Sequence, residues 1–179
     1  MTNDEINDTI ENIATDIAHM LKIQYPIENI DDIVNKLNGK IQKVSHIEEK
    51  GLYKINDEKF IIKMTPYDNN KQRTIQMAMQ IGHLFLHMGY LINKDIWKRQ
   101  HISKPYGYYI SHEDAITKEW QAYKFAQALL MPKELYKEQT EKNTENNTIN
   151  TKKIAEYFNV TRSAATSRGV TLGIIEPTL

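Results

Sequence analysis

Residues 73–87 read Arg-Thr-Ile-Gln-Met-Ala-Met-Gln-Ile-Gly-His-Leu-Phe-Leu-His. In a helix with this sequence, apolar side chains occupy nearly every face, and Gly82 and His83 lie among them. A helix that is apolar on all sides is buried inside a domain, because no face of it is suited to water. The pattern therefore predicts a central buried helix over residues 71–89.

The segments before this helix predict helices followed by strands. Residues 4–22 and 27–37 carry apolar residues at three- and four-residue spacing, which is typical of amphipathic helices. Short apolar runs at 41–47, 52–55 and 60–64 predict three strands, with Asn56-Asp57 as the turn between the last two. The fold class expected is α+β, with helices packed on a small three-stranded sheet.

The segments after the central helix predict further helices and a polar connection. Residues 90–110 are loop-like and aromatic, and Ser111 and Asp114 have the spacing of an N-cap for a helix over 113–130. We expect one domain over residues 1–136 and a polar linker or solvated turn over 137–150, where Lys, Glu, Asn and Thr dominate. Residues 151–179 resemble a helix-turn-helix packed on the domain, with its turn ending at Thr161.

Composition excludes several classes of protein. The 179 residues hold 23 basic and 23 acidic side chains, so the chain lacks the positive charge of a general nucleic-acid binder. Cysteine is absent, which removes disulfides, thiol nucleophiles and cysteine-ligated metals. No apolar run approaches the ~18 residues of a membrane span, and the acidic start lacks a signal-peptide core. We expect a cytoplasmic protein.

Residues 73–87 and the later phrase Glu119-Trp-Gln-Ala-Tyr-Lys-Phe-Ala-Gln-Ala-Leu-Leu-Met-Pro132 together resemble the ImmA/IrrE family of small zinc metallopeptidases. In that family a buried helix carries His-Glu-x-x-His, and a later helix carries a glutamate followed by a phrase ending in Leu-Leu-Met-Pro. Here the later phrase runs from Glu119 to Pro132, and the first phrase retains Gly82, His83 and His87. The resemblance covers nearly the whole chain and implies a minimal zincin-like domain.

Two positions of the zinc motif are changed. The His-Glu-x-x-His motif works because residues four apart share a helix face, and the glutamate takes a proton from zinc-bound water. The corresponding residues here are Met79, Gln80 and His83. A thioether is a weak ligand for zinc, and an amide does not act as a base. The resemblance thus implies a vestigial metal set of Met79, His83 and Glu119, with no intact catalytic residue and no bound cofactor.

An active zinc endopeptidase with a displaced site is the first alternative. His83 and His87 repeat the four-residue spacing one turn later, and Glu119 completes a set of three, with His112 and Glu113 as further donors. Against it, the site would shift by ~6 Å along the helix, and residue 84 is Leu where a base is needed. The simpler reading is a buried His83 that is hydrogen-bonded to Glu119 or Gln80.

The expected function is protein binding by an inactive relative. Active members of the family relieve repression by cutting a helix-turn-helix repressor, so the resemblance implies an anti-repressor or an inhibitor in the regulation of phages or mobile elements. The partner-binding candidates are the aromatic residues of the loop region, namely Trp97, Tyr106, Tyr108 and Tyr109. The sequence does not indicate an oligomeric state.

A DNA-binding regulator is the second alternative. The helix-turn-helix-like segment carries the basic residues Lys152, Lys153, Arg162 and Arg168, with Glu156 opposing them. Four basic groups on a neutral chain give weak support for DNA readout, so DNA is not the expected partner.

Overall fold

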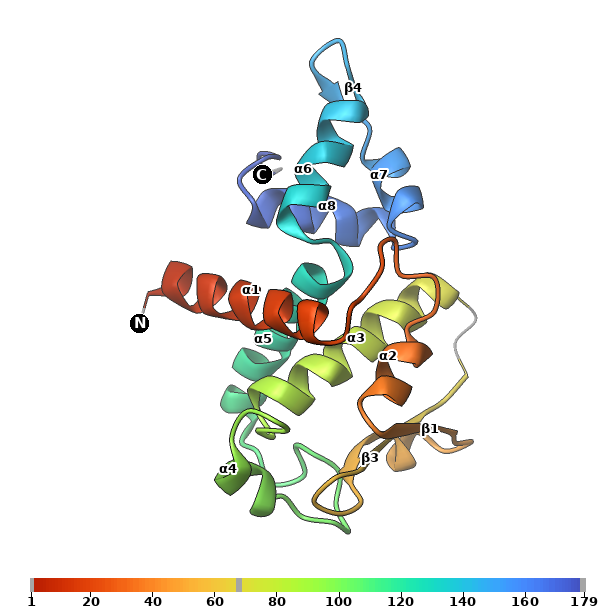
Figure 1. Ribbon diagram of the computed structural model, residues 1–179, viewed down its shortest axis with the longest axis vertical. Coiled ribbons are helices and arrows are strands. Elements are labelled where there is room, and N and C mark those ends of the chain that lie inside the picture. The colour runs from red at the N-terminus through yellow and green to blue at the C-terminus, as the bar shows by residue number, and fades with distance from the viewer. Residues whose placement is uncertain (1, 67–68, 178–179) are drawn as a thin grey trace. The chain divides into compact units, whose positions relative to one another are not determined.

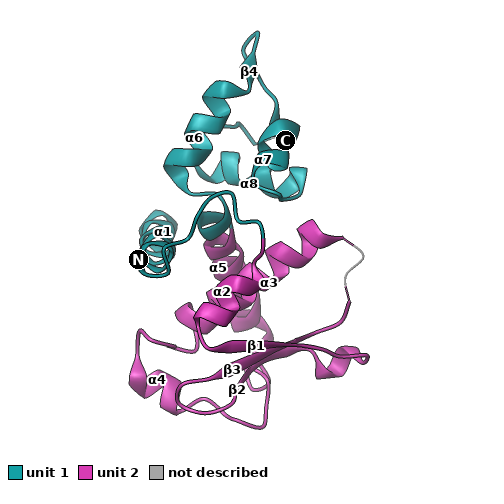
Figure 2. Ribbon diagram, turned by 45° about the vertical axis from the view of Figure 1, so that its right-hand side comes forward, with its two compact units in different colours: residues 1–28, 127–179 teal, residues 29–126 magenta. Residues whose placement is uncertain are grey.

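The computed structural model describes residues 2–66 and 69–177, which fall into two compact units (Figure 2). One unit is Asn29–Ala126. The other joins Met1–Glu28 to Gln127–Leu179, so segments from both ends of the chain share one unit. The boundary falls within helix α5 (His112–Leu130), and each unit is described by itself below.

The unit Asn29–Ala126 contains the three-stranded sheet that the sequence predicts. Strands β1 (Gly39–Lys43), β2 (Gly51–Lys54) and β3 (Phe60–Met64) are arranged in the order β1-β3-β2. β1 pairs with β3 in parallel and β2 pairs with it antiparallel. Leu52, Phe60 and Ile62 are fully buried on one face of the sheet. Figure 2 shows α2 (Asp31–Lys36) and α3 (Asn70–Leu86) on one side of the sheet.

Helix α3 is the central helix, and its burial confirms the prediction. Asn69 begins it by accepting hydrogen bonds from the N–H groups of Lys71 and Gln72. A Cβ on Gly82 would lie 3.2 Å from the backbone of Ala122, so glycine allows α3 and α5 to approach closely. The predicted N-cap of α5 is also present, because Ser111 Oγ accepts from Asp114 N–H at 3.2 Å.

The loop-like region before α5 contains one short helix. Helix α4 (Lys94–Lys98) begins at Asn93, whose side chain accepts from two backbone N–H groups. A short 3₁₀ turn, Ile47–Glu49, precedes β2. Both elements are too short to be detected from periodicity, because three to five residues hold too few apolar positions to define a repeat.

The second unit contains α1 (Asn3–Met20), α6 (Lys133–Lys142), α7 (Thr151–Tyr157) and α8 (Arg162–Thr171) (Figure 1). The predicted helix-turn-helix-like pair is present as α7 and α8, and Thr161 caps α8 by accepting from Ala164 N–H. No helix in the described part of the chain combines the length and apolar character needed to cross a membrane.

Residues 137–150, expected as a polar linker, are ordered elements instead. They form the end of α6 and a hairpin of β4 (Thr144–Glu145) and β5 (Thr148–Ile149). Composition misled the prediction because only Tyr136 and Gln139 of α6 are buried, which leaves a polar helix surface. Asn146 and Asn147 both have positive φ, the conformation of a tight hairpin turn, and asparagine adopts it readily.

Candidate metal centre

His83 and Glu119 face each other within the unit Asn29–Ala126. His83 lies on α3 with 3% of its surface exposed, and its Nε2 lies 3.2 Å from Glu119 Oε1 on α5. The hydrogen bond from His83 holds the pKa of Glu119 below its usual value, so this carboxyl is ionised at neutral pH. The predicted pairing of the two residues is therefore present.

A hydrogen-bonded chain continues from His83 along the same helix. His83 Nδ1 lies 3.0 Å from His87 Nδ1, and His87 Nε2 lies 2.9 Å from Gln121 Oε1. The amide oxygen of Gln121 accepts, so His87 donates from Nε2 and accepts at Nδ1. His83 thus contacts His87 through Nδ1 and Glu119 through Nε2, so both of its ring nitrogens are engaged.

Burial keeps His87 neutral. Loss of hydration lowers the pKa of His87 to about 4, against the hydrogen bond to Gln121, which raises it. At neutral pH the ring of His87 is therefore uncharged. Sequence reasoning missed Gln121, because its pairing with His87 arises from the packing of α3 against α5 and leaves no local pattern.

The low pKa of His87 predicts an acid-sensitive stability. Between pH 6.5 and about 4, the unfolded chain binds a proton at this position that the folded chain does not, so the free energy of unfolding falls as the pH is lowered through this window. We expect His87→Gln to lose less stability than wild type between pH 7 and pH 5 in urea unfolding. His46→Gln, at an exposed histidine, serves as the control and should follow wild type. If the free energy of unfolding depended on pH in the same way in wild type and in His87→Gln, the lowered pKa assigned to His87 would be contradicted.

Met79 and Gln80 lie one turn before His83 on α3. Met79 is buried, whereas Gln80 is half-buried and lines a cavity of about 220 Å³ together with Gln76 and Lys63. Two ligands of one tetrahedral zinc lie about 3.3 Å apart, so the spacing of His83 and Glu119 is compatible with zinc. The third place of the pattern holds a thioether, which is a poor zinc ligand.

The ligand set as a whole therefore does not fit zinc. Within residues 2–66 and 69–177, no group of three or more His, Cys, Asp or Glu side chains is arranged to hold a metal ion. The residues that complete the family pattern, Met79 and Gln80, supply neither a third strong ligand nor a base.

The displaced set is not gathered around one point. His83 faces His87 through Nδ1 and Glu119 through Nε2, so these two partners lie at opposite nitrogens of one ring. An ion bound at either nitrogen would reach only one of them. His112 and Glu113 are in the first turn of α5, about 10 Å along the helix axis from Glu119.

The aromatic candidates separate into buried and exposed residues. Trp97 was expected on a binding surface, but it is 4% exposed: its indole N–H donates to Asp57 O and its ring packs edge-on against Tyr90. Tyr108 and Tyr109 are exposed. The expectation for Trp97 is therefore wrong, because sequence alone does not distinguish a core tryptophan from a surface one.

Tyr106 lies between these extremes and covers the histidines. Its N–H donates to Leu52 O at 2.7 Å, and its ring stacks on His87 with centroids 5.9 Å apart and planes at 8°. Burial raises the pKa of Tyr106, and its hydroxyl is buried without a hydrogen-bond partner among the described residues. The ring also lies 5.1 Å from the His83 ring, centroid to centroid, and thus shields the His83–His87 pair from one side.

A buried histidine helix, a glutamate on a second helix and a small mixed sheet together define a zincin-like domain of the metallopeptidase type. The family model of the IrrE N-terminal-like domain matches residues 48–168, and the chain belongs to this family. No curated protein matches the sequence at a significant level.

The fold is also found in a solved structure. A Mycobacterium tuberculosis transcriptional regulator is similar to this chain with a TM-score of 0.52 and 14% sequence identity. The alignment covers 93% of this chain and 47% of the regulator, so the chain spans about half the length of that protein. At this identity the likeness concerns the fold alone.

Proposed function

We propose that this chain is a catalytically inactive member of the IrrE-like family that acts by binding another protein. The observation that carries the proposal is the pair Met79 and Gln80 on α3, at the places of a zinc ligand and of the general base. Loss of a positioned base alone costs a factor of ~10² to 10⁴ in rate, and loss of the metal removes the activated water as well.

Binding does not require the missing groups. Hydrolysis depends on interactions that stabilise the transition state. Recognition of a protein depends on the shape and charge of the binding surface, which remain when the zinc ligand and the base are absent. The contact between His83 and Glu119 pairs the two remaining polar groups of the pattern with each other without a metal. This supports a role in which the fold is used as a binding scaffold.

The proposed partner is a helix-turn-helix repressor, and the proposed role is that of an anti-repressor or inhibitor in phage or mobile-element regulation. Family resemblance supports this choice, because active relatives act on such repressors. The similar fold within a transcriptional regulator is consistent with a regulatory setting. Binding of this chain to the repressor would relieve repression without cleavage of the repressor.

The test uses a helix-turn-helix repressor whose gene adjoins the gene of this chain, once the neighbouring reading frames are known. We expect the two purified proteins to co-elute in size-exclusion chromatography, with the repressor intact by mass spectrometry after incubation with added zinc. Repressor fragments whose formation depends on wild-type chain and zinc would show an active peptidase. Failure of the two proteins to associate, with both folded, would overturn the binding role.

Direct DNA binding is disfavoured by the environment of the basic residues. The guanidinium of Arg168 is 1% exposed and pairs with Glu11. Lys152 lies 4.0 Å from Glu156, and Lys153 lies 3.6 Å from Glu145. The two arginines are thus engaged within their own unit, since Arg162 Nε–H donates to Thr151 Oγ1, and the two lysines lie beside exposed glutamates.

A further inference from the structure

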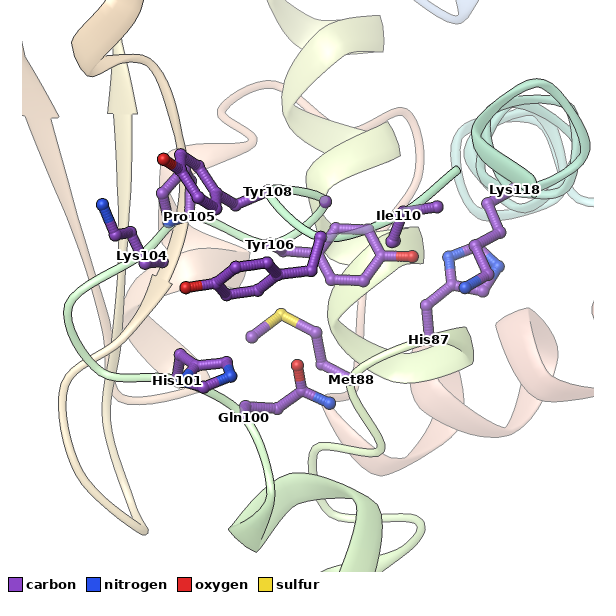
Figure 3. Close-up of a pocket in the computed structure, with 12 residues that line it drawn as sticks. His87, Met88, Gln100, His101, Lys104, Pro105, Tyr106, Tyr108, Ile110 and Lys118 are labelled. Atoms are coloured by element: carbon purple, nitrogen blue, oxygen red, sulfur yellow. The ribbon is translucent and has the colours of Figure 1, made fainter. Parts of the chain in front are cut away.

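A pocket of about 250 Å³ opens beside His87 in the unit Asn29–Ala126 (Figure 3). It is formed by the loop of residues 100–110, the chain just after α3 and one residue of α5. We call it the tyrosine pocket, because Tyr106, Tyr108 and Tyr109 line it, together with Met88 and Gln100. The pocket is separate from the cavity beside Gln80, which has a different set of lining residues.

The outer wall of the tyrosine pocket is exposed and aromatic. Tyr108 is 58% exposed and Tyr109 is 68% exposed, with their rings in edge contact at 4.9 Å. Ile102, in the same loop, is 61% exposed. A local group of large exposed apolar side chains marks an interaction surface, and tyrosine is among the residues that contribute most to binding energy.

The charge of the pocket is positive. Lys104 and Lys118 lie on opposite sides of it in Figure 3, and no Asp or Glu is among the described residues that line it. Over the described part of the chain, no carboxylate forms an ion pair with Lys104 or Lys118, although Lys104 Nζ lies 4.3 Å from the centroid of the Tyr108 ring.

The size of the pocket favours a side chain of a protein partner over a small organic ligand. Pockets for small organic ligands usually measure ~300 to 1,000 Å³. At about 250 Å³ the tyrosine pocket is smaller, but it has room for one large side chain of a protein partner. Anchors of this kind, inserted into a pocket and surrounded by polar contacts, dominate the energy of protein interfaces.

We infer that the tyrosine pocket docks an acidic segment of a partner protein. One aromatic or large aliphatic side chain of the segment inserts between the tyrosines, and flanking carboxylates pair with Lys104 and Lys118. The inference rests on the proposed protein-binding function and adds to it the docking site and the chemistry of the partner. Charge complementarity selects the segment, and the apolar anchor supplies most of the affinity.

The test uses three fluorescein-labelled pentapeptides and the full chain. Their sequences are Glu-Glu-Trp-Glu-Glu, Glu-Glu-Gly-Glu-Glu and Lys-Lys-Trp-Lys-Lys. We expect the first to bind at least tenfold more tightly than either of the others in fluorescence anisotropy, and backbone NMR shifts on its addition to cluster in residues 100–110. Equal affinity for the three peptides, shifts centred elsewhere, or equally tight binding of a five-nucleotide oligothymidylate would overturn the inference.

Variants localise the binding. Lys104→Glu with Lys118→Glu should weaken the acidic tryptophan peptide at least tenfold and should favour the basic one, whereas Tyr109→Ala should weaken both tryptophan peptides. The matched control is Lys59→Glu with Lys133→Glu, which makes the same charge change at exposed lysines outside the pocket and should have a smaller effect. Equal losses in the two double variants would contradict docking in the pocket.

These outcomes separate the inference from the proposed function. If the acidic peptide fails to bind and the intact repressor still co-elutes, the docking site is wrong and the binding role stands. If the peptide binds as expected and wild type cleaves the repressor with zinc, the docking site stands and the assignment as an inactive protein is wrong.

Discussion

The double variant Met79→His with Gln80→Glu is expected to bind one zinc ion per chain, whereas wild type retains none after dialysis. The two changes rebuild His-Glu-Ile-Gly-His over residues 79–83. Residues four apart lie on one face of α3, and His83 Nε2 is already 3.2 Å from Glu119 Oε1. Three strong ligands would then converge, which is the ligand number of catalytic zinc sites.

Measurements of zinc content and of hydrolysis distinguish the effect of the added zinc ligand from the effect of the added base. Met79→His alone should bind zinc but hydrolyse a susceptible protein substrate ~10² to 10⁴-fold more slowly than the double variant, because it lacks the base. Met79→Leu with Gln80→Glu is the matched control: it adds the carboxylate without the imidazole and should bind no zinc. The readout is metal content by mass spectrometry after dialysis.

Further substitutions identify the ligands. In the double variant, His83→Ala and Glu119→Ala should each remove zinc, whereas Asp95→Ala, on the short helix α4, should leave zinc binding unchanged. A folded double variant that takes up no zinc would mean that the site has been placed wrongly on α3. Stoichiometric zinc in the wild-type chain would instead show that Met79 is compatible with a metal site, and it would remove the basis for the inactive assignment.

Arg168→Ala is expected to destabilise the chain by about 3–5 kcal/mol, the cost of removing one member of a buried ion pair. The Arg168 side chain is buried at 1% exposure, and its two terminal nitrogens lie 2.8 Å and 2.6 Å from the carboxylate oxygens of Glu11. Its Nε–H also donates to Met131 O at 2.9 Å. Truncation leaves a partly buried carboxylate and a backbone carbonyl without this partner.

The measurement is the free energy of unfolding from urea titrations followed by circular dichroism. Arg162→Ala, at an exposed arginine on the same helix, is the control and should cost less than about 1 kcal/mol. Arg168→Lys should recover only part of the loss, because lysine does not reproduce the two-pronged contact with Glu11. A cost below about 1 kcal/mol for Arg168→Ala would contradict a structural role for this residue.

The elements that were predicted correctly are those with local signals. The central helix, the strands at 52–55 and 60–64, and the caps at Ser111 and Thr161 each depend on residues within a few positions of one another. The end of α6 and the hairpin within residues 137–150 gave no local signal, since the composition is polar while α6 is held by two buried residues and the hairpin by the Asn146-Asn147 turn.

The candidate site was only partly predictable. The resemblance of residues 79–83 and of the later glutamate to the zinc motif of the family implies that Met79, Gln80, His83 and Glu119 form one set. The chain from His83 through His87 to Gln121 was not predictable, nor was the cover provided by Tyr106. These contacts join residues that are brought together by helix packing and by a loop, and neither is encoded in a short repeat.

The sequence by itself determined which chemical groups this protein has: an imidazole and a carboxylate in a zincin-like pattern, with a thioether and an amide where a ligand and a base belong. Only the tertiary structure decided what those groups contact. It placed Arg168 in an ion pair with Glu11, 157 residues away, and buried Trp97 while leaving Tyr109 exposed. The physical reason is that burial and pairing depend on which distant segments pack together, whereas periodicity reports only the face on which a residue lies.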